Sequence, residues 1–114
     1  MPPRTPKHLE DIRDACAFIL EVTRGISSVD FAKDRLRRQA VERNFEIVGE
    51  ALRRIDRNDP AIFRQIPDCR RIIAFRNILA HAYDGIDHAI VWQIIEDDVP
   101  RLLEVVECLL SELS

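Results

Sequence analysis

Residues 41–56, with the sequence VERNFEIVGEALRRID, carry the pattern that decides the fold. Their apolar side chains recur at intervals of four, three, four and three residues, which places them on one face of an α-helix: Val41, Phe45, Val48, Leu52 and Ile55. Most of the intervening positions are charged or polar, as is typical of a helix that packs one side against a core. We therefore predict one helical stretch from about Asp30 to Asp56.

The segment before this stretch repeats the helical pattern. Thr5 is a capping residue, and Pro6 follows it in the first turn, where the missing N–H costs nothing. We predict a helix that starts there and ends at Gly25. Its apolar face comprises Leu9, Ile12, Cys16 and Ile19.

Two shorter features follow the long helical stretch. Asp59 and Pro60 open a short helical turn, which Pro67 closes. Asp68 then caps a third main helix, which we expect to stop near the Asp-Gly pair at positions 84–85.

The last helix is predicted to be the longest, with Asp87 as its cap. It carries a heptad-like apolar seam, made of Val91, Ile95, Val99, Leu102, Val106, Leu109 and Leu113. Pro100 lies inside the seam, so we expect a kink near Asp98. Because the seam is long for so small a chain, we expect a second copy to bury part of it or part of the third helix.

Composition indicates one soluble all-α domain over residues 1–114, built as an up-down bundle of about four main helices. Of the 114 residues, 46% are hydrophobic, enough to build a core, and 32% are charged. No apolar run approaches the ~20 residues of a membrane span, and the start lacks the apolar stretch of a secretory signal. We expect a cytoplasmic protein with no membrane partner. The net charge of −3 argues against a generic nucleic-acid coat.

The side chains best suited to binding a phosphate and transferring a proton lie in the octet RNILAHAY, residues 76–83. On a helix, its polar residues fall on the side opposite the core face: Arg76, Asn77, His81 and Tyr83. A guanidinium matches phosphate oxygens, and an imidazole transfers protons near neutral pH. Arg76 and His81 together suffice for metal-free RNA cleavage. Since one histidine cannot easily act as both base and acid, two copies meeting across a two-fold axis would supply the second set.

Other charged residues were weighed as candidates. Arg70 and Arg71 lie just before the octet, and we expect them to contact the RNA backbone. Glu46 and Glu50 lie one turn apart, where the role of arginine partner is favoured over that of an acid/base pair. Arginines gather in two basic clusters, the first at positions 35–43 and the second at positions 64–76. The remaining arginines of both clusters are interpreted mainly as a solvated face: Arg35, Arg37, Arg38, Arg43 and Arg64.

The remaining distinctive residues are interpreted as structural. His8 and His88 are expected at the surface near helix starts, and with His81 their spacing is unrelated, so no metal site is predicted. Trp92 is expected to pack or to lie in an interface rather than stack on bases. The widely separated cysteines are expected to be small buried hydrophobes, namely Cys16, Cys69 and Cys108.

The pattern Arg76-x4-His81-x-Tyr83, with Asn77 after the arginine, resembles the HepT family of small all-helical HEPN-domain ribonuclease toxins. The flanking stretches VERNFEIVGEA (41–51) and VWQIIEDDVPRLLE (91–104) are also similar to that family, as is the Asp-Gly-Ile-Asp after Tyr83. The resemblance therefore covers nearly the whole chain and shows no departure at the octet.

The resemblance implies a homodimer whose octets face a composite cleft and cut RNA, tRNA being one candidate, without a metal or cofactor. By position, Arg76 and His81 would be catalytic and Asn77 would support their geometry. The family's antitoxin is a minimal nucleotidyltransferase, which transfers AMP from ATP onto the motif tyrosine. Tyr83 would be that acceptor, and the added phosphate would pair with Arg76 and exclude RNA.

Two other interpretations remain open at this point. The chain could be a non-catalytic helical subunit that binds a minimal nucleotidyltransferase, with the octet merely docking a phosphate. It could also be a structural helical dimer without a ligand. The polar arc of the octet speaks against the latter, because a plain bundle gains nothing from grouping those four side chains.

Overall fold

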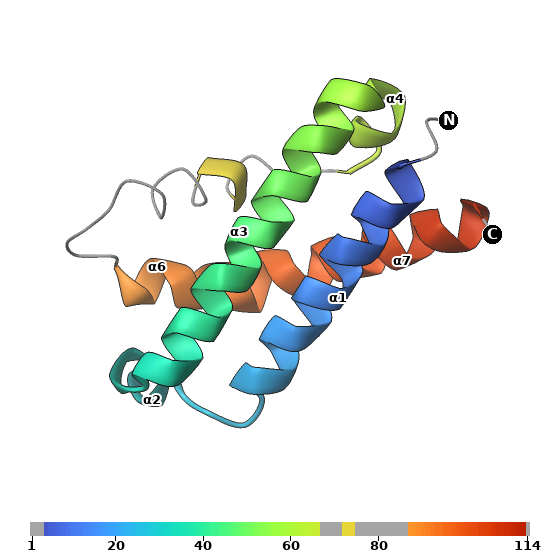
Figure 1. Ribbon diagram of the computed structural model, residues 1–114. Helices are drawn as coiled ribbons and strands as arrows, with labels where there is room; N and C mark the ends of the chain where they lie inside the picture. Colours follow the sequence, from blue (N-terminus) through green and yellow to red (C-terminus); the bar gives the residue numbers. More distant parts are fainter. Residues whose placement is uncertain (1–3, 67–71, 75–86, 114) are drawn as a thin grey trace.

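The computed structural model describes residues 4–66, 72–74 and 87–113, and every regular element among them is helical, which confirms the all-α fold class (Figure 1). The elements are α1 (Thr5–Thr23), α2 (Ser28–Lys33), α3 (Arg35–Asn58), α4 (Pro60–Phe63), α6 (His88–Gln93), the π-helix η1 (Ile94–Asp98) and α7 (Val99–Leu113). None of these helices is both long and apolar enough to cross a bilayer.

Two layers of helices enclose the core. Figure 1 shows α1 and α3 running antiparallel side by side, while the continuous α6–η1–α7 segment crosses behind them. The predicted apolar face of α1 and that of α3 are both buried between the layers. The fully buried large side chains include Leu9, Ile12, Ile19, Phe31, Phe45, Leu52 and Ile55. Each of these helices therefore packs against the core through one apolar face.

The start of α1 differs in detail from the prediction. Thr5 is the first helical residue, and Arg4, which has no capping side-chain bond, occupies the N-cap position. The Thr5 hydroxyl instead donates a hydrogen bond of 3.1 Å to the Asp59 carboxylate, tying α1 to the α3–α4 junction. The helix ends at Thr23, and Gly25 follows with φ +79°, the left-handed conformation that favours glycine.

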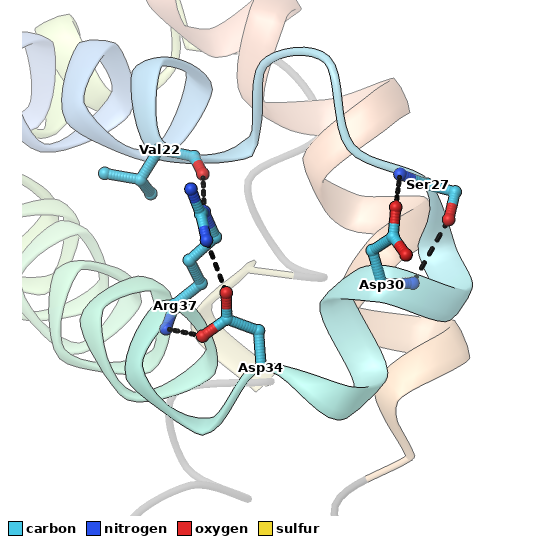
Figure 2. A network of polar contacts seen from close by, with 5 residues as sticks. All are labelled: Val22, Ser27, Asp30, Asp34 and Arg37. Atoms are coloured by element: carbon cyan, nitrogen blue, oxygen red, sulfur yellow. Dashed lines mark hydrogen bonds and ion pairs between the residues drawn. The ribbon is translucent and has the colours of Figure 1, made fainter.

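The predicted continuous helix over 30–56 is wrong in one respect, because Asp34 divides it into α2 and α3. Asp34 leaves the helical conformation, and its carboxylate accepts a bond of 3.0 Å from the Arg37 N–H as the cap of α3. Ser27 and Asp30 form a capping box at the start of α2. In Figure 2, Arg37 links the α2–α3 junction to the end of α1: it pairs with Asp34, and its Nε donates a hydrogen bond of 2.8 Å to the Val22 carbonyl.

The predicted cap of the C-terminal helical segment and its predicted irregularity near Asp98 are both confirmed. The Asp87 carboxylate accepts a bond of 2.9 Å from the Ala89 N–H at the start of α6. The π-helix ends at Asp98, two residues before Pro100. A proline removes a helical hydrogen bond and crowds the carbonyl four residues earlier, and a wider turn relieves that conflict. The short turn at Asp59 and Pro60 is likewise confirmed as α4.

The apolar seam of this segment is buried within the single chain. Six of its seven members are at most 5% exposed, and only Leu113 is 37% exposed. A second copy of the chain is therefore not needed to bury these six residues, because α1 packs against α7 within the same chain. Of the predicted third helix, residues 72–74 are described and helical, and its proposed boundaries lie outside the described residues.

The expected burial of the cysteines is confirmed for Cys16 and is wrong for Cys108. Cys16 is fully buried in the core, as predicted. Cys108 is exposed on α7, because its helical position points away from the seam. Cys69 lies outside the described residues. Trp92 packs against Phe31 with ring centroids 5.4 Å apart, which confirms a packing role.

Candidate functional site

The predicted site residues all fall in 67–71 or 75–86, outside the residues that the structure describes: Arg70, Arg71, Arg76, Asn77, His81 and Tyr83. Their roles therefore stay predictions. The structure does describe the chain immediately before and after the octet, and these segments form the frame of the candidate site.

The frame is anchored to the core on both sides of the octet. Before it, Ile66 is 4% exposed and Ile72 is 1% exposed, so both are held in the main cluster of buried side chains. After it, Asp87 caps α6, and Val91 is 1% exposed one turn later. Buried anchors hold the two ends of the segment that carries the octet.

Three ionisable side chains interact close to the start of α6, which directly follows the octet segment in the sequence: Arg38 and Glu42 of α3 and His88 of α6. His88 is half-buried at the start of α6, and its Nδ1 atom has no hydrogen-bond partner among the described residues. Partial burial raises the pKa of Glu42, while electrostatic interaction with His88 and Arg38 acts in the opposite direction. Glu42 and His88 are 46 positions apart in the sequence, so no local pattern indicates that they interact. From the sequence, His88 was expected at the surface.

The first basic cluster on α3 is largely engaged in structural bonds. Arg37 pairs with Asp34, Arg38 donates 2.5 Å to the Ala32 carbonyl, and Arg43 pairs with Glu46 at 3.2 Å. These bonds hold the α2–α3 turn and the surface of α3. These arginines were predicted to form a solvated face; the structure instead gives Arg37, Arg38 and Arg43 protein partners.

The two glutamates on α3 also have arginine partners, as favoured from the sequence. Glu46 pairs with Arg43, and Glu50 pairs with Arg54 at 3.2 Å. Both ion pairs line an open cleft of about 260 Å³ between α1 and α3, together with His8, Asp11, Ile47 and Ala51. This arrangement favours a structural role over a pair of acid/base carboxylates.

The expected surface position of His8 is wrong, since this residue is only 8% exposed in the wall of the cleft. The face of α1 that carries it turns toward α3, which a helical pattern alone cannot indicate because histidine occurs on both buried and exposed faces. Within residues 4–66, 72–74 and 87–113, no three His, Cys, Asp or Glu side chains are grouped as a metal site would require.

Comparison with known proteins gives consistent matches. The family described as "Ribonuclease HepT-like" matches residues 12–109. A candidate RNase of Methanocaldococcus jannaschii is 36% identical, over 87% of this chain and 90% of its own length. A protein of Thermococcus cleftensis named probable ribonuclease HepT is 38% identical, over 83% of this chain and 86% of its own length.

A third relative, a candidate RNase of Caldanaerobacter subterraneus, is 33% identical over 96% of this chain and 97% of its own length. No solved structure matches the chain significantly. The family match begins within α1 and ends in α7, so in the sequence it includes both helical layers and the octet 76–83. The chain belongs to the HepT-like ribonuclease family.

Proposed function

We propose that this protein is a metal-independent endoribonuclease of the HEPN type, acting as the toxin of a toxin–antitoxin pair in the cytoplasm. The observation that carries the proposal is the family match over residues 12–109, a span that contains the complete octet 76–83. The buried anchors on both sides of the octet support it, because a catalytic segment must be held by a rigid frame.

In the proposed reaction, His81 removes the proton from a ribose 2′-hydroxyl. The 2′-oxygen then forms a bond to the adjacent phosphorus, and the bond from phosphorus to the 5′-oxygen breaks. Arg76 stabilises the negative charge that grows on the phosphoryl oxygens, and Asn77 supports the geometry of the pair. A second His81, from the other protomer of a homodimer, protonates the leaving 5′-oxygen.

Regulation in this proposal acts on Tyr83. A minimal nucleotidyltransferase antitoxin would transfer AMP from ATP, forming a bond from the tyrosine oxygen to the α-phosphorus and releasing pyrophosphate. The new phosphate would pair with Arg76 and occupy the space that an RNA phosphate requires. Arg70 and Arg71 would contact the RNA backbone near the cut, with tRNA as a candidate substrate.

The test is cleavage of total RNA and tRNA in EDTA by wild type and by His81→Ala. Intact mass spectrometry of each sample first establishes whether Tyr83 carries AMP. We expect unmodified wild type to cut and His81→Ala to lose at least a hundredfold in rate, the usual contribution of a general acid–base group. The fragment ends should carry 2′,3′-cyclic phosphate, the product of attack by the neighbouring 2′-oxygen.

His88→Gln is the matched control, because it removes another histidine of the same region without changing the octet. It should retain cleavage within about threefold, the ordinary scatter of single-site effects. Absence of cutting by unmodified wild type would overturn the enzyme proposal. It would favour the alternative of a non-catalytic subunit that binds a nucleotidyltransferase.

A further inference from the structure

Three arginines at the end of the molecule formed by α3 and α4 are exposed and make no ion pair with a described residue. They are Arg53 and Arg57 on α3 and Arg64 at the end of α4, and we call them the α3–α4 arginine surface. We propose that this surface binds the phosphate backbone of the RNA substrate, outside the octet. The inference rests on the proposed ribonuclease function, and it names the part of the protein that would hold the substrate.

The positions of the three side chains suit a strand of phosphates. Arg53 and Arg57 are four residues apart, so they lie on one face of α3 with a rise of about 6 Å between them. The chain then turns at Asp59 into α4, whose last turn leads to Arg64. In Figure 1, α4 folds back beside the C-terminal end of α3, which brings Arg64 to the same end of the molecule.

The other arginines of α3 provide a contrast. Arg43 and Arg54 pair with Glu46 and Glu50, and Arg37 and Arg38 bond to the α1–α2–α3 turns. Each of them already has a protein acceptor, and in Arg43 and Arg54 the carboxylate partner offsets the positive charge that a phosphate would meet. The guanidinium groups of the α3–α4 arginine surface make no ion pair with any described residue, so a phosphate that binds them breaks no such pair.

The carboxylates close to this surface do not cancel its charge. Asp59 is 7% exposed and accepts bonds from the Thr5 hydroxyl and from the Ile62 N–H at 3.4 Å, so it is committed to the fold. Asp56 is the one exposed carboxylate between Arg53 and Arg57 in the sequence. Glu50, on the same helix, is already paired with Arg54, so the three guanidinium groups face one nearby carboxylate, Asp56, that has no arginine partner among the described residues.

The distribution of charge over the chain also favours RNA binding at the α3–α4 end of the molecule. Residues 87–113 carry seven carboxylates and one arginine, although the chain as a whole has a net charge of only −3. This acidic segment forms the layer that crosses behind α1 and α3 in Figure 1. An RNA strand would be repelled by that layer and steered toward the arginines on the α3–α4 end.

The experiment compares RNA binding by wild type and by the triple variant Arg53→Gln, Arg57→Gln, Arg64→Gln. The probe is a fluorescent single-stranded RNA with a 2′-O-methyl group on every ribose, so that no 2′-hydroxyl can attack and cleavage cannot occur. Affinity is measured by anisotropy at several KCl concentrations. We expect binding at about 50 mM KCl to weaken at least tenfold and the log–log salt slope to shrink by about two, since each single-strand phosphate contact contributes about 0.7.

A matched control is available at the opposite end of α3. Arg24, Lys33 and Arg35 are also exposed, also lack ion pairs with described residues, and carry the same total charge. Their triple replacement by glutamine should change affinity less than about twofold and leave the salt slope near that of wild type. Circular dichroism and thermal unfolding confirm that both triple variants remain folded.

The possible outcomes distinguish failure of this inference from failure of the proposed ribonuclease function. A selective loss in the α3–α4 variant supports the inference, even if wild type fails to cut RNA in the separate EDTA assay. Equal losses in both triple variants would show that bulk charge alone governs binding and would overturn it. Unchanged RNA affinity in the α3–α4 variant would also overturn it, and would point to an acidic protein as the occupant of this surface.

Discussion

Cys16 and Cys108 have the same side chain in two opposite environments. Cys16 is fully buried, and the cost of placing a thiolate in the core raises its pKa to about 12. Cys108 is exposed on α7, with its thiol 3.7 Å from a carboxylate oxygen of Glu112. We expect iodoacetamide at about pH 8 to label Cys108 in the native protein and to leave Cys16 unlabelled, because only the accessible thiolate reacts.

Peptide mapping by mass spectrometry checks this prediction, since it assigns each label to a cysteine. The control is the same reaction in guanidinium chloride, in which Cys16 should label as readily as Cys108. Rapid native labelling of Cys16 would contradict the burial of the α1 face against α3 and α7.

At the level of elements, Asp34 decides where α2 ends and α3 begins. The backbone N–H of Arg37 and then its guanidinium hold the pKa of Asp34 below its usual value. A carboxyl whose pKa is lowered on folding contributes stability above its unfolded pKa of about 3.9, and this contribution is lost as pH falls through the folded pKa. We expect Asp34→Ala to lower the melting temperature at pH 7, and the difference from wild type to disappear in acid below the folded pKa.

Thermal unfolding followed by circular dichroism from pH 7 down to about pH 2 tests this. Asp34→Asn serves as the control, because an amide oxygen can still cap α3 but carries no charge. Its melting temperature should fall between the other two at pH 7. An Asp34→Ala deficit that is the same at every pH would mean that the carboxylate charge contributes nothing at this cap.

The whole molecule depends on one core shared by its two layers. Leu52 on α3 is fully buried in that core, whereas Leu36 on the same helix is 81% exposed. We expect Leu52→Ala to lower the free energy of unfolding by about 2–5 kcal/mol, through lost burial and the cavity left behind. Leu36→Ala should change it by less than about 0.5 kcal/mol.

Urea unfolding, followed by fluorescence of Trp92 and by circular dichroism, measures both variants. Coincident transitions of the two probes are expected, because the α6 helix that carries Trp92 packs against α2 and the shared core. A small loss for Leu52→Ala, or separate transitions for the two probes, would contradict the single core.

Sequence pattern alone was sufficient for the all-α fold class, for the buried faces of α1 and α3 and for the resemblance to the family. The spacing of Val41, Phe45 and Leu52 predicted the buried face of α3, and Asp87 predicted the start of α6. These signals are local, since a cap and a helical face depend on residues three or four positions apart. The catalytic assignment of Arg76 and His81 also comes from local spacing and stays a prediction.

Tertiary structure decided the features that depend on distant neighbours. It buried His8 against α3, exposed Cys108 and brought Glu42 close to His88. It also determined which arginines are engaged by carboxylates or carbonyls and which remain at the surface. The physical reason is that burial and pairing depend on which helix covers a given face, and this depends on how the two layers cross rather than on the periodicity of either one.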